Sequence, residues 1–168
     1  MKKIAILIED LVEEVEFLYP FYRFREEGFE IQVVGPEKRA YKGKHGMVFN
    51  ADKAIEEVKN KLYDLIFIPG GYCPDRLRRS EEILNFVKSH YEKDKLVAAI
   101  CHGPWVLISA GITKGKKITG YFSIKDDIIN SGARYVDEPA VEDGNIITAQ
   151  NPASMPKMLK IILKKLGV

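Results

Sequence analysis

The sequence predicts an α/β fold, a flavodoxin-like doubly wound and mainly parallel sheet with helices on both faces. Short apolar runs rich in β-branched residues recur along the chain, which is typical of strands buried on both faces. Segments with helical periodicity alternate with these runs, so that right-handed crossovers join parallel strands. Glycine and capping residues mark several of the borders between them.

The first half of the chain supplies three strands. Lys2–Ile8 predicts the first strand, and residues 12–27 predict a helix that Gly28 stops and that Pro20 kinks or splits. The elements predicted after it are a strand at 29–35, a glycine-punctuated loop or hairpin at 41–52, a short helix at 53–61, and a strand with a tight turn at 64–71.

The second half continues the alternation. Ser80 is a typical N-cap, and Glu81 and Glu82 after it suit the positive end of a helix dipole, so we expect a helix to about Lys93. The elements predicted after it are a core strand at 96–100, a helix at 102–111 stopped by Gly111, a hairpin at 140–149 with its turn at Asp143–Gly144, and an amphipathic helix at 152–168.

Composition indicates one domain, residues 1–168, without repeats or linkers. A net charge of +2 with 30% charged residues predicts neither a nucleic acid nor a membrane as partner. Glu9 and Asp10 interrupt the N-terminal apolar run, which does not continue as a signal peptide. Two cysteines form no disulfide framework, so we expect a reducing, cytoplasmic compartment. We expect no cofactor and no metal.

Three segments are predicted to meet beyond the carboxyl ends of the strands, where open α/β sheets collect their ligands. They are Glu9–Glu16 after the first strand, the sequence PGG after Ile68, and the sequence CHG after Ile100. This convergence predicts a functional site.

Cys101 is the candidate nucleophile of that site. At a strand-to-helix turn, backbone N–H groups and the positive helix end favour the thiolate. Gly103 permits the tight turn and the close approach of a substrate, as in the nucleophile elbow of hydrolases, although Ala99 replaces the first glycine of that pattern. The alternative is that Cys101 is a small buried hydrophobic residue.

The three histidines carry different expectations. His102 adjoins Cys101, and a strained turn could bring the two side chains together as nucleophile and base. No histidine follows position 102, which excludes a triad of the class I amidotransferase type. His45 lies in a loop, where it either caps the backbone or lines the pocket, and His90 is expected to be solvated.

Glycines and acids complete the candidate site. The N–H groups of Gly70 and Gly71 could form an oxyanion hole with the amide after Cys101, or the glycines could serve only a tight turn. Glu13 and Glu16 lie on the segment that starts at the strand ends. A half-buried Glu16 could hydrogen-bond the sulfur, being protonated when the thiolate is charged.

Four stretches carry a resemblance to a known family: PGG after a strand, AICHGP at the elbow, KHG in the early loop, and IKDDIINSGARYVDE downstream. Together they resemble the ThiJ/PfpI family over nearly the whole chain, closest to its intracellular-peptidase (PfpI) branch. The resemblance implies a class I glutamine amidotransferase-like fold with Cys101 as nucleophile and His102 as its neighbour. It also implies Glu16 beneath the sulfur, and an oxyanion cradle made by Gly70, Gly71 and the His102 amide.

The resemblance further implies a shared active site. In the peptidase branch a neighbouring subunit supplies the acid that orients the histidine; the matching position is Asp75, where the family more usually has Glu. The chain would then act only as a homo-oligomer, a dimer or a hexamer built from dimers. Tyr121 stands near a position that is histidine in the glyoxalase-like and deglycase branches. Cys73, in the same loop as Asp75, is expected to be incidental rather than a resolving thiol.

The sequence is compatible with three functions. The first is a cysteine-dependent hydrolase of the peptidase type, acting on peptides. The second is a glyoxalase or deglycase acting on methylglyoxal and its protein adducts, because a thiolate adds readily to an activated carbonyl. The third is a redox-sensing stress-response or chaperone protein, since a reactive thiolate is readily oxidised.

Overall fold

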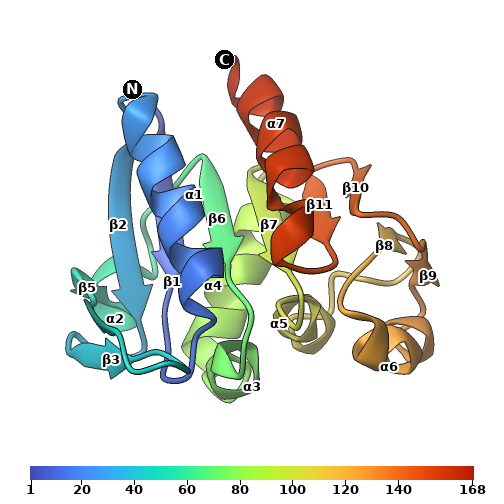
Figure 1. The fold of residues 1–168 in the computed structure, drawn as a ribbon, viewed down its shortest axis with the longest axis horizontal. Coiled ribbons are helices and arrows are strands. Elements are labelled where there is room, and N and C mark those ends of the chain that lie inside the picture. The colour runs from blue at the N-terminus through green and yellow to red at the C-terminus, as the bar shows by residue number, and fades with distance from the viewer.

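The computed structural model describes residues 1–168 and contains a seven-stranded sheet in the order β10-β11-β7-β6-β1-β2-β5 (Figure 1). Neighbouring strands are parallel except for β10 and β11. The strands are β1 (Lys3–Leu7), β2 (Glu30–Gly35), β5 (Lys53–Ala54), β6 (Leu65–Ile68), β7 (Leu96–Ile100), β10 (Ala140–Asp143) and β11 (Ile146–Ala149). The predicted mainly parallel α/β fold is confirmed.

Helices cover both faces of this sheet. In Figure 1, α1 (Glu14–Glu26) and α7 (Met155–Leu166) lie side by side in front of it, and they contact each other. The opposite face carries α2 (Ile55–Val58), α4 (Glu81–Glu92) and α5 (Pro104–Ser109), with α4 and α5 both packed on β7. None of these helices combines the length and apolar character needed to span a bilayer.

Local signals set several element borders as predicted. The Ser80 hydroxyl accepts the Ile83 N–H at 3.3 Å and caps α4, and Gly144 with φ of 60° forms the β10–β11 turn. Of the two predicted effects of Pro20, a kink or a split, the split is wrong, because α1 is continuous through this buried residue. Proline removes one backbone donor there, and burial against the core compensates for that loss.

Several smaller elements were not predicted, because they are too short to show a periodic pattern. They are the helices α3 (Cys73–Leu77) and α6 (Lys125–Asn130), the strand pair β8 (Lys117–Ile118) and β9 (Arg134–Tyr135), and the 3-10 turns Phe122–Ile124 and Pro152–Ser154. The expected hairpin is present as β3 (Ala40–Lys42) and β4 (Val48–Asn50).

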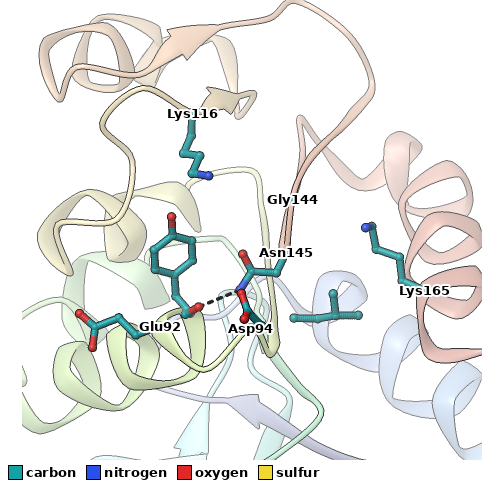
Figure 2. A pocket seen from close by; sticks show the side chains of 8 residues that line it. Glu92, Asp94, Lys116, Gly144, Asn145 and Lys165 are labelled. Atoms are coloured by element: carbon teal, nitrogen blue, oxygen red, sulfur yellow. Dashed lines mark hydrogen bonds between the residues drawn. The ribbon is translucent and has the colours of Figure 1, made fainter.

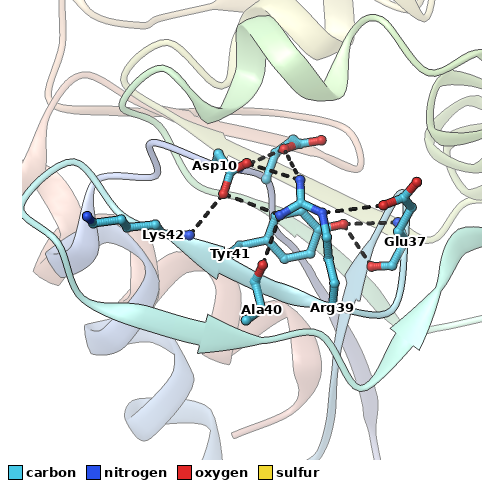
Figure 3. Close-up of polar contacts among 7 residues, drawn as sticks. Asp10, Glu37, Arg39, Ala40, Tyr41 and Lys42 are labelled. Carbon is cyan, nitrogen blue, oxygen red and sulfur yellow. Dashed lines mark hydrogen bonds and ion pairs between the residues drawn. The ribbon is translucent and has the colours of Figure 1, made fainter.

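A polar cluster fixes this hairpin to the loop after β1 (Figure 3). The Arg39 guanidinium lies 3.8 Å from the centre of the Tyr41 ring and pairs with Asp10 at 3.0 Å. Asp10 also accepts the Lys42 N–H at 2.9 Å. Burial opposes ionisation of Asp10, but hydrogen bonds from Arg39 and Lys42 outweigh it and lower its pKa. The cluster therefore places the hairpin tip over the carboxyl ends of the strands.

The expectation that His90 is solvated is wrong. Its side chain is buried between Tyr63 and Phe86, and its Nε2 accepts the Tyr63 N–H at 3.0 Å. Nδ1 therefore carries the proton and donates to the Phe86 carbonyl at 2.7 Å. Burial lowers the pKa of His90, so the folded protein holds the imidazole neutral.

We predict that His90→Leu costs about 1–3 kcal/mol of unfolding free energy at pH 7.5, because it leaves the buried Tyr63 N–H without an acceptor. The wild-type protein loses stability as the pH falls below the ordinary histidine pKa of 6.5, because the folded state disfavours protonation of His90. The leucine variant has no such loss at this position. Urea denaturation at both pH values should show that the difference in unfolding free energy between the two proteins is smaller at pH 5 than at pH 7.5. A gap that is independent of pH would contradict the buried, neutral His90.

Candidate functional site

A cavity of about 340 Å³ lies where the carboxyl ends of β1, β6 and β7 meet. The three predicted segments converge there, and Val12 forms an isolated bridge to Gly71 between two of them. The lining residues are Glu13, Glu16, Lys44, Gly71, Tyr72, Cys101, His102, Tyr121, Ser123 and Pro152. The predicted site residues Glu13, Glu16, Gly71, Cys101, His102 and Tyr121 are among them.

Cys101 occupies a strained turn directly after β7. Its φ is +62°, in the left-handed region that residues with a side chain rarely adopt. Two hydrogen bonds hold it: its N–H donates to Ala149 at 2.9 Å, and its carbonyl accepts the Tyr121 N–H at 2.9 Å. The predicted strand-to-helix elbow is therefore present, with the sulfur at the cavity edge.

Gly103 serves the elbow differently from the expectation. It does not line the cavity, and a Cβ built on it would lie 2.8 Å from the backbone N of Ile100 and 2.9 Å from the Ile68 carbonyl oxygen. The backbone beneath the turn, not an approaching substrate, requires a glycine here. Gly70 is similarly constrained, since its Cβ would lie 2.8 Å from the Cβ of Cys101.

Glu16 is fully buried beside Cys101, on the first turn of α1. Its Oε1 accepts the Gly70 N–H at 2.9 Å, and its Oε2 has no hydrogen-bond partner. Burial raises the pKa of Glu16 to about 7 despite the bond from Gly70. A carboxyl group that is half protonated near neutral pH is suited to carry protons.

Cys101 does not ionise independently, contrary to the expected thiolate. Burial, and then the Glu16 charge, raise the pKa of Cys101 to about 12, and the N–H groups of His102 and Gly71 only partly oppose them. Between about 7 and about 12 the pair holds a single negative charge. Protonation of Glu16 is therefore the condition for a thiolate at Cys101.

The expected oxyanion donors are only partly free. The Gly70 N–H is occupied by Glu16, so the expectation that Gly70 contributes to an oxyanion hole is wrong for this arrangement. The N–H groups of His102 and of Gly71, the latter at φ of +76°, lower the pKa of Cys101. These two donors stabilise negative charge on sulfur first.

His102 contacts the thiol directly, although the two residues are adjacent in sequence. Its Nδ1 lies 3.3 Å from the Cys101 sulfur, and its ring stacks on Tyr121 with centroids 5.2 Å apart. Burial and the charge of Lys44 lower the pKa of His102, which is therefore mainly neutral at pH 7. A neutral imidazole in contact with a thiol can accept its proton.

Lys44 was missed by the sequence reading, in which nothing distinguished it from the other lysines. It lies at the tip of the β3–β4 hairpin, where its N–H donates to the Val12 carbonyl at 3.0 Å. Its Nζ pairs with Glu13 at 2.9 Å, and this bond raises the pKa of Lys44. The ammonium group is therefore a fixed positive charge at the cavity wall.

Three other predicted residues lie outside the cavity. His45 bonds through Nδ1 to Glu14 at 2.9 Å and is largely exposed, so it anchors the hairpin and the pocket expectation is wrong. Asp75, on α3, pairs with Arg79; its role between subunits stays a prediction. Cys73 is fully buried, and burial raises its pKa well above the ordinary range, which suits a packing role.

A larger hollow of about 710 Å³ lies at the opposite end of the sheet, before β7 and β11 (Figure 2). Its walls carry Lys116, Lys165 and Asn145, and the Asn145 amide donates to the carbonyls of Tyr91 and Lys95. No cysteine, serine, threonine or histidine lines it, and no group of three or more potential metal ligands exists in the structure. The Cys101 cavity is therefore the candidate active site.

We predict that Glu16→Gln makes the protein relatively more stable as the pH rises. The pKa of Glu16 is raised from 4.5 to about 7 on folding, so its stabilising contribution is complete below pH 4.5 and is lost as the pH rises through 7. The variant should gain about 3 kcal/mol over wild type between pH 4.5 and pH 8 in urea denaturation. A difference in unfolding free energy that does not change with pH would contradict the raised pKa of Glu16.

We also predict that Lys44→Met slows alkylation of Cys101 by iodoacetamide at pH 7 roughly threefold to tenfold, because it removes the positive charge near the acid pair. The matched control is Lys42→Met, an exposed position on β3 outside the cavity, which should react at the wild-type rate. Mass spectrometry of the Cys101 peptide measures both rates. Equal rates in the two variants would exclude an electrostatic role of Lys44.

Comparison with known proteins gives consistent matches over almost the whole chain. The sequence model of the DJ-1/PfpI family matches residues 2–165. A deglycase of Pyrococcus abyssi is 40% identical over 98% of this chain and 99% of its own. A protein of Bacillus subtilis named "Putative cysteine protease YraA" is 43% identical over 90% of each chain.

A solved structure agrees with the sequence matches. A two-domain protein of Anabaena variabilis, with DJ-1/ThiJ/PfpI-like and ferritin-like domains, superposes with a TM-score of 0.95 and 42% identity. The match covers 99% of this chain and 48% of that one. The family model over residues 2–165 and the relative at 40% identity show that the chain belongs to the DJ-1/PfpI family.

Proposed function

We propose that this protein is a cysteine-dependent enzyme acting on small α-oxoaldehydes and on their adducts with amines, as a glyoxalase or deglycase. The observation that carries the proposal is the pairing of Cys101 with Glu16, whose pKa of about 7 makes it able to give and take a proton. The deglycase name of the Pyrococcus abyssi relative supports the same substrate class.

The cavity favours a small substrate over a polypeptide. Its volume of about 340 Å³ suits a three-carbon carbonyl compound attached to a side chain. Amide hydrolysis would have only the N–H groups of Gly71 and His102 to bind a developing oxyanion, because Gly70 donates to Glu16. These two features rank carbonyl chemistry above the peptidase activity that the sequence alone placed first.

The reaction needs no oxidant or reductant. The Cys101 sulfur attacks the aldehyde-derived carbon, the amine leaves with a proton, and a hemithioacetal forms. A proton then moves from this carbon to its oxo-bearing neighbour through an enediol, which converts the hemithioacetal into a thioester of a 2-hydroxy acid. Water cleaves the thioester, which releases the 2-hydroxy acid and restores the thiol.

Each side chain has a role in this sequence. His102 accepts the thiol proton through Nδ1, at 3.3 Å from the sulfur. Glu16 carries the proton between the two carbons, since its Oε2 is buried without another partner. Lys44 and the N–H groups of Gly71 and His102 stabilise the negative charge on sulfur and on the enediol.

A peptidase is the second candidate, supported by the name of the Bacillus subtilis relative at 43% identity. It would use the same Cys101 nucleophile with His102 as base, so loss of Cys101 alone does not separate the two functions. Glu16 discriminates between the two functions, because amide hydrolysis needs no proton transfer between two carbon atoms.

We predict that the purified protein converts methylglyoxal to lactate, detected by NMR, and releases lactate from methylglyoxal-treated N-acetyllysine. Cys101→Ser should abolish the conversion, and Glu16→Gln should reduce it by roughly a hundredfold or more. Cys73→Ser, at a buried cysteine outside the cavity, is the control and should retain activity.

Cleavage of a casein-derived peptide is measured in parallel with the same four proteins. Peptide cleavage that needs Cys101 but tolerates Glu16→Gln, without lactate formation, would replace the proposed function by the peptidase. Lactate formation that survives Cys101→Ser would reject the nucleophile itself.

A further inference from the structure

The imidazole of His102 has a second polar contact on the side away from Cys101. Its Nε2 lies 3.4 Å from the Ser123 hydroxyl oxygen, and Ser123 lines the same cavity. The nearby acid Asp127 is already committed, since its Oδ2 accepts the Trp105 indole N–H at 2.9 Å. Asp75 pairs with Arg79 and does not reach the cavity in this chain.

We propose that Ser123 is the positioning residue for His102: its hydroxyl accepts the Nε2–H and so leaves Nδ1 as the acceptor facing Cys101. A neutral imidazole carries one N–H, and the partner of one nitrogen determines the role of the other. With Nε2 protonated, the lone pair of Nδ1 points at the thiol 3.3 Å away. The inference rests on the Cys101 nucleophile of the proposed function.

The segment that carries Ser123 is tied to the elbow. The Tyr121 N–H donates to the Cys101 carbonyl, and the Tyr121 carbonyl accepts the Ile124 N–H at 3.0 Å. Ile124 is buried, and the Tyr121 ring stacks on His102. The backbone on both sides of the exposed Ser123 is thereby anchored beside the imidazole.

The proton balance of the first step follows from this arrangement. The thiol proton moves to Nδ1, which leaves a thiolate on Cys101 and an imidazolium whose Nε2–H still donates to Ser123. The imidazolium then returns the proton to the departing amine, and the starting tautomer is restored. A residue of the same chain can thus orient the base.

The test uses the full-length protein and compares Ser123→Ala, Ser123→Thr and Asp75→Asn. Nitrogen NMR of ¹⁵N-histidine-labelled protein at pH 7.5, with His102 assigned by His102→Gln, reports which ring nitrogen carries the proton. We expect the Nε2–H tautomer in wild type, a shift toward Nδ1–H in Ser123→Ala, and recovery in Ser123→Thr. The rate constant kcat for lactate formation should fall roughly threefold to tenfold in Ser123→Ala and recover in Ser123→Thr.

Two results would overturn the proposal. One is an unchanged tautomer in Ser123→Ala; the other is a tautomer that changes in Asp75→Asn but not in Ser123→Ala, which would assign the role to the acid across subunits. The NMR measurement does not require turnover. A protein inactive on methylglyoxal whose His102 tautomer still depends on Ser123 would therefore reject the proposed function and retain the Ser123 assignment.

Discussion

The left-handed conformation of Cys101 is the constraint on which the site depends. A φ of +62° at a residue with a side chain costs about 1–3 kcal/mol, and the surrounding structure must supply it. Hydrogen bonds to Ala149 and Tyr121 and the closely packed glycines at positions 70 and 103 hold the turn. Only in this turn can the sulfur touch the imidazole of the next residue and lie beside the buried Glu16.

The strain at the elbow is linked to its electrostatics. Burial raises the pKa of both the Cys101 thiol and the Glu16 carboxyl group, and the charge of Glu16 raises the pKa of Cys101 further. The hairpin held by Arg39 and Asp10 places the positive charge of Lys44 at the cavity wall, which favours the single negative charge of the pair. The hairpin, although far from Cys101 in sequence, thus influences the proton equilibrium between Cys101 and Glu16.

Much of the fold was predictable because the strands are apolar and the helices amphipathic, and the shared edge of parallel strands brought Glu16, Gly71 and Cys101 together. Burial of His90 was not predictable, because a histidine in a charged helix shows no sign of facing the Tyr63 backbone. The position of Lys44 depends on a hairpin anchored by long-range ion pairs, which no local pattern records. Short elements such as α3 had too few residues for periodicity.

The sequence pattern predicted a thiolate at Cys101, whereas burial raises the pKa of its thiol. Helix-end and backbone effects suggested a free thiolate, but burial is a tertiary property and reverses their balance. Infrared difference spectroscopy of the carboxyl C=O stretch, with Glu16→Gln as the blank, measures most directly whether Glu16 holds the proton of the pair. The raised pKa predicts a protonated Glu16 band that disappears with a midpoint near pH 7. Loss of that band at or below pH 5 would show that the carboxyl group ionises independently, and the shared-proton site would be excluded.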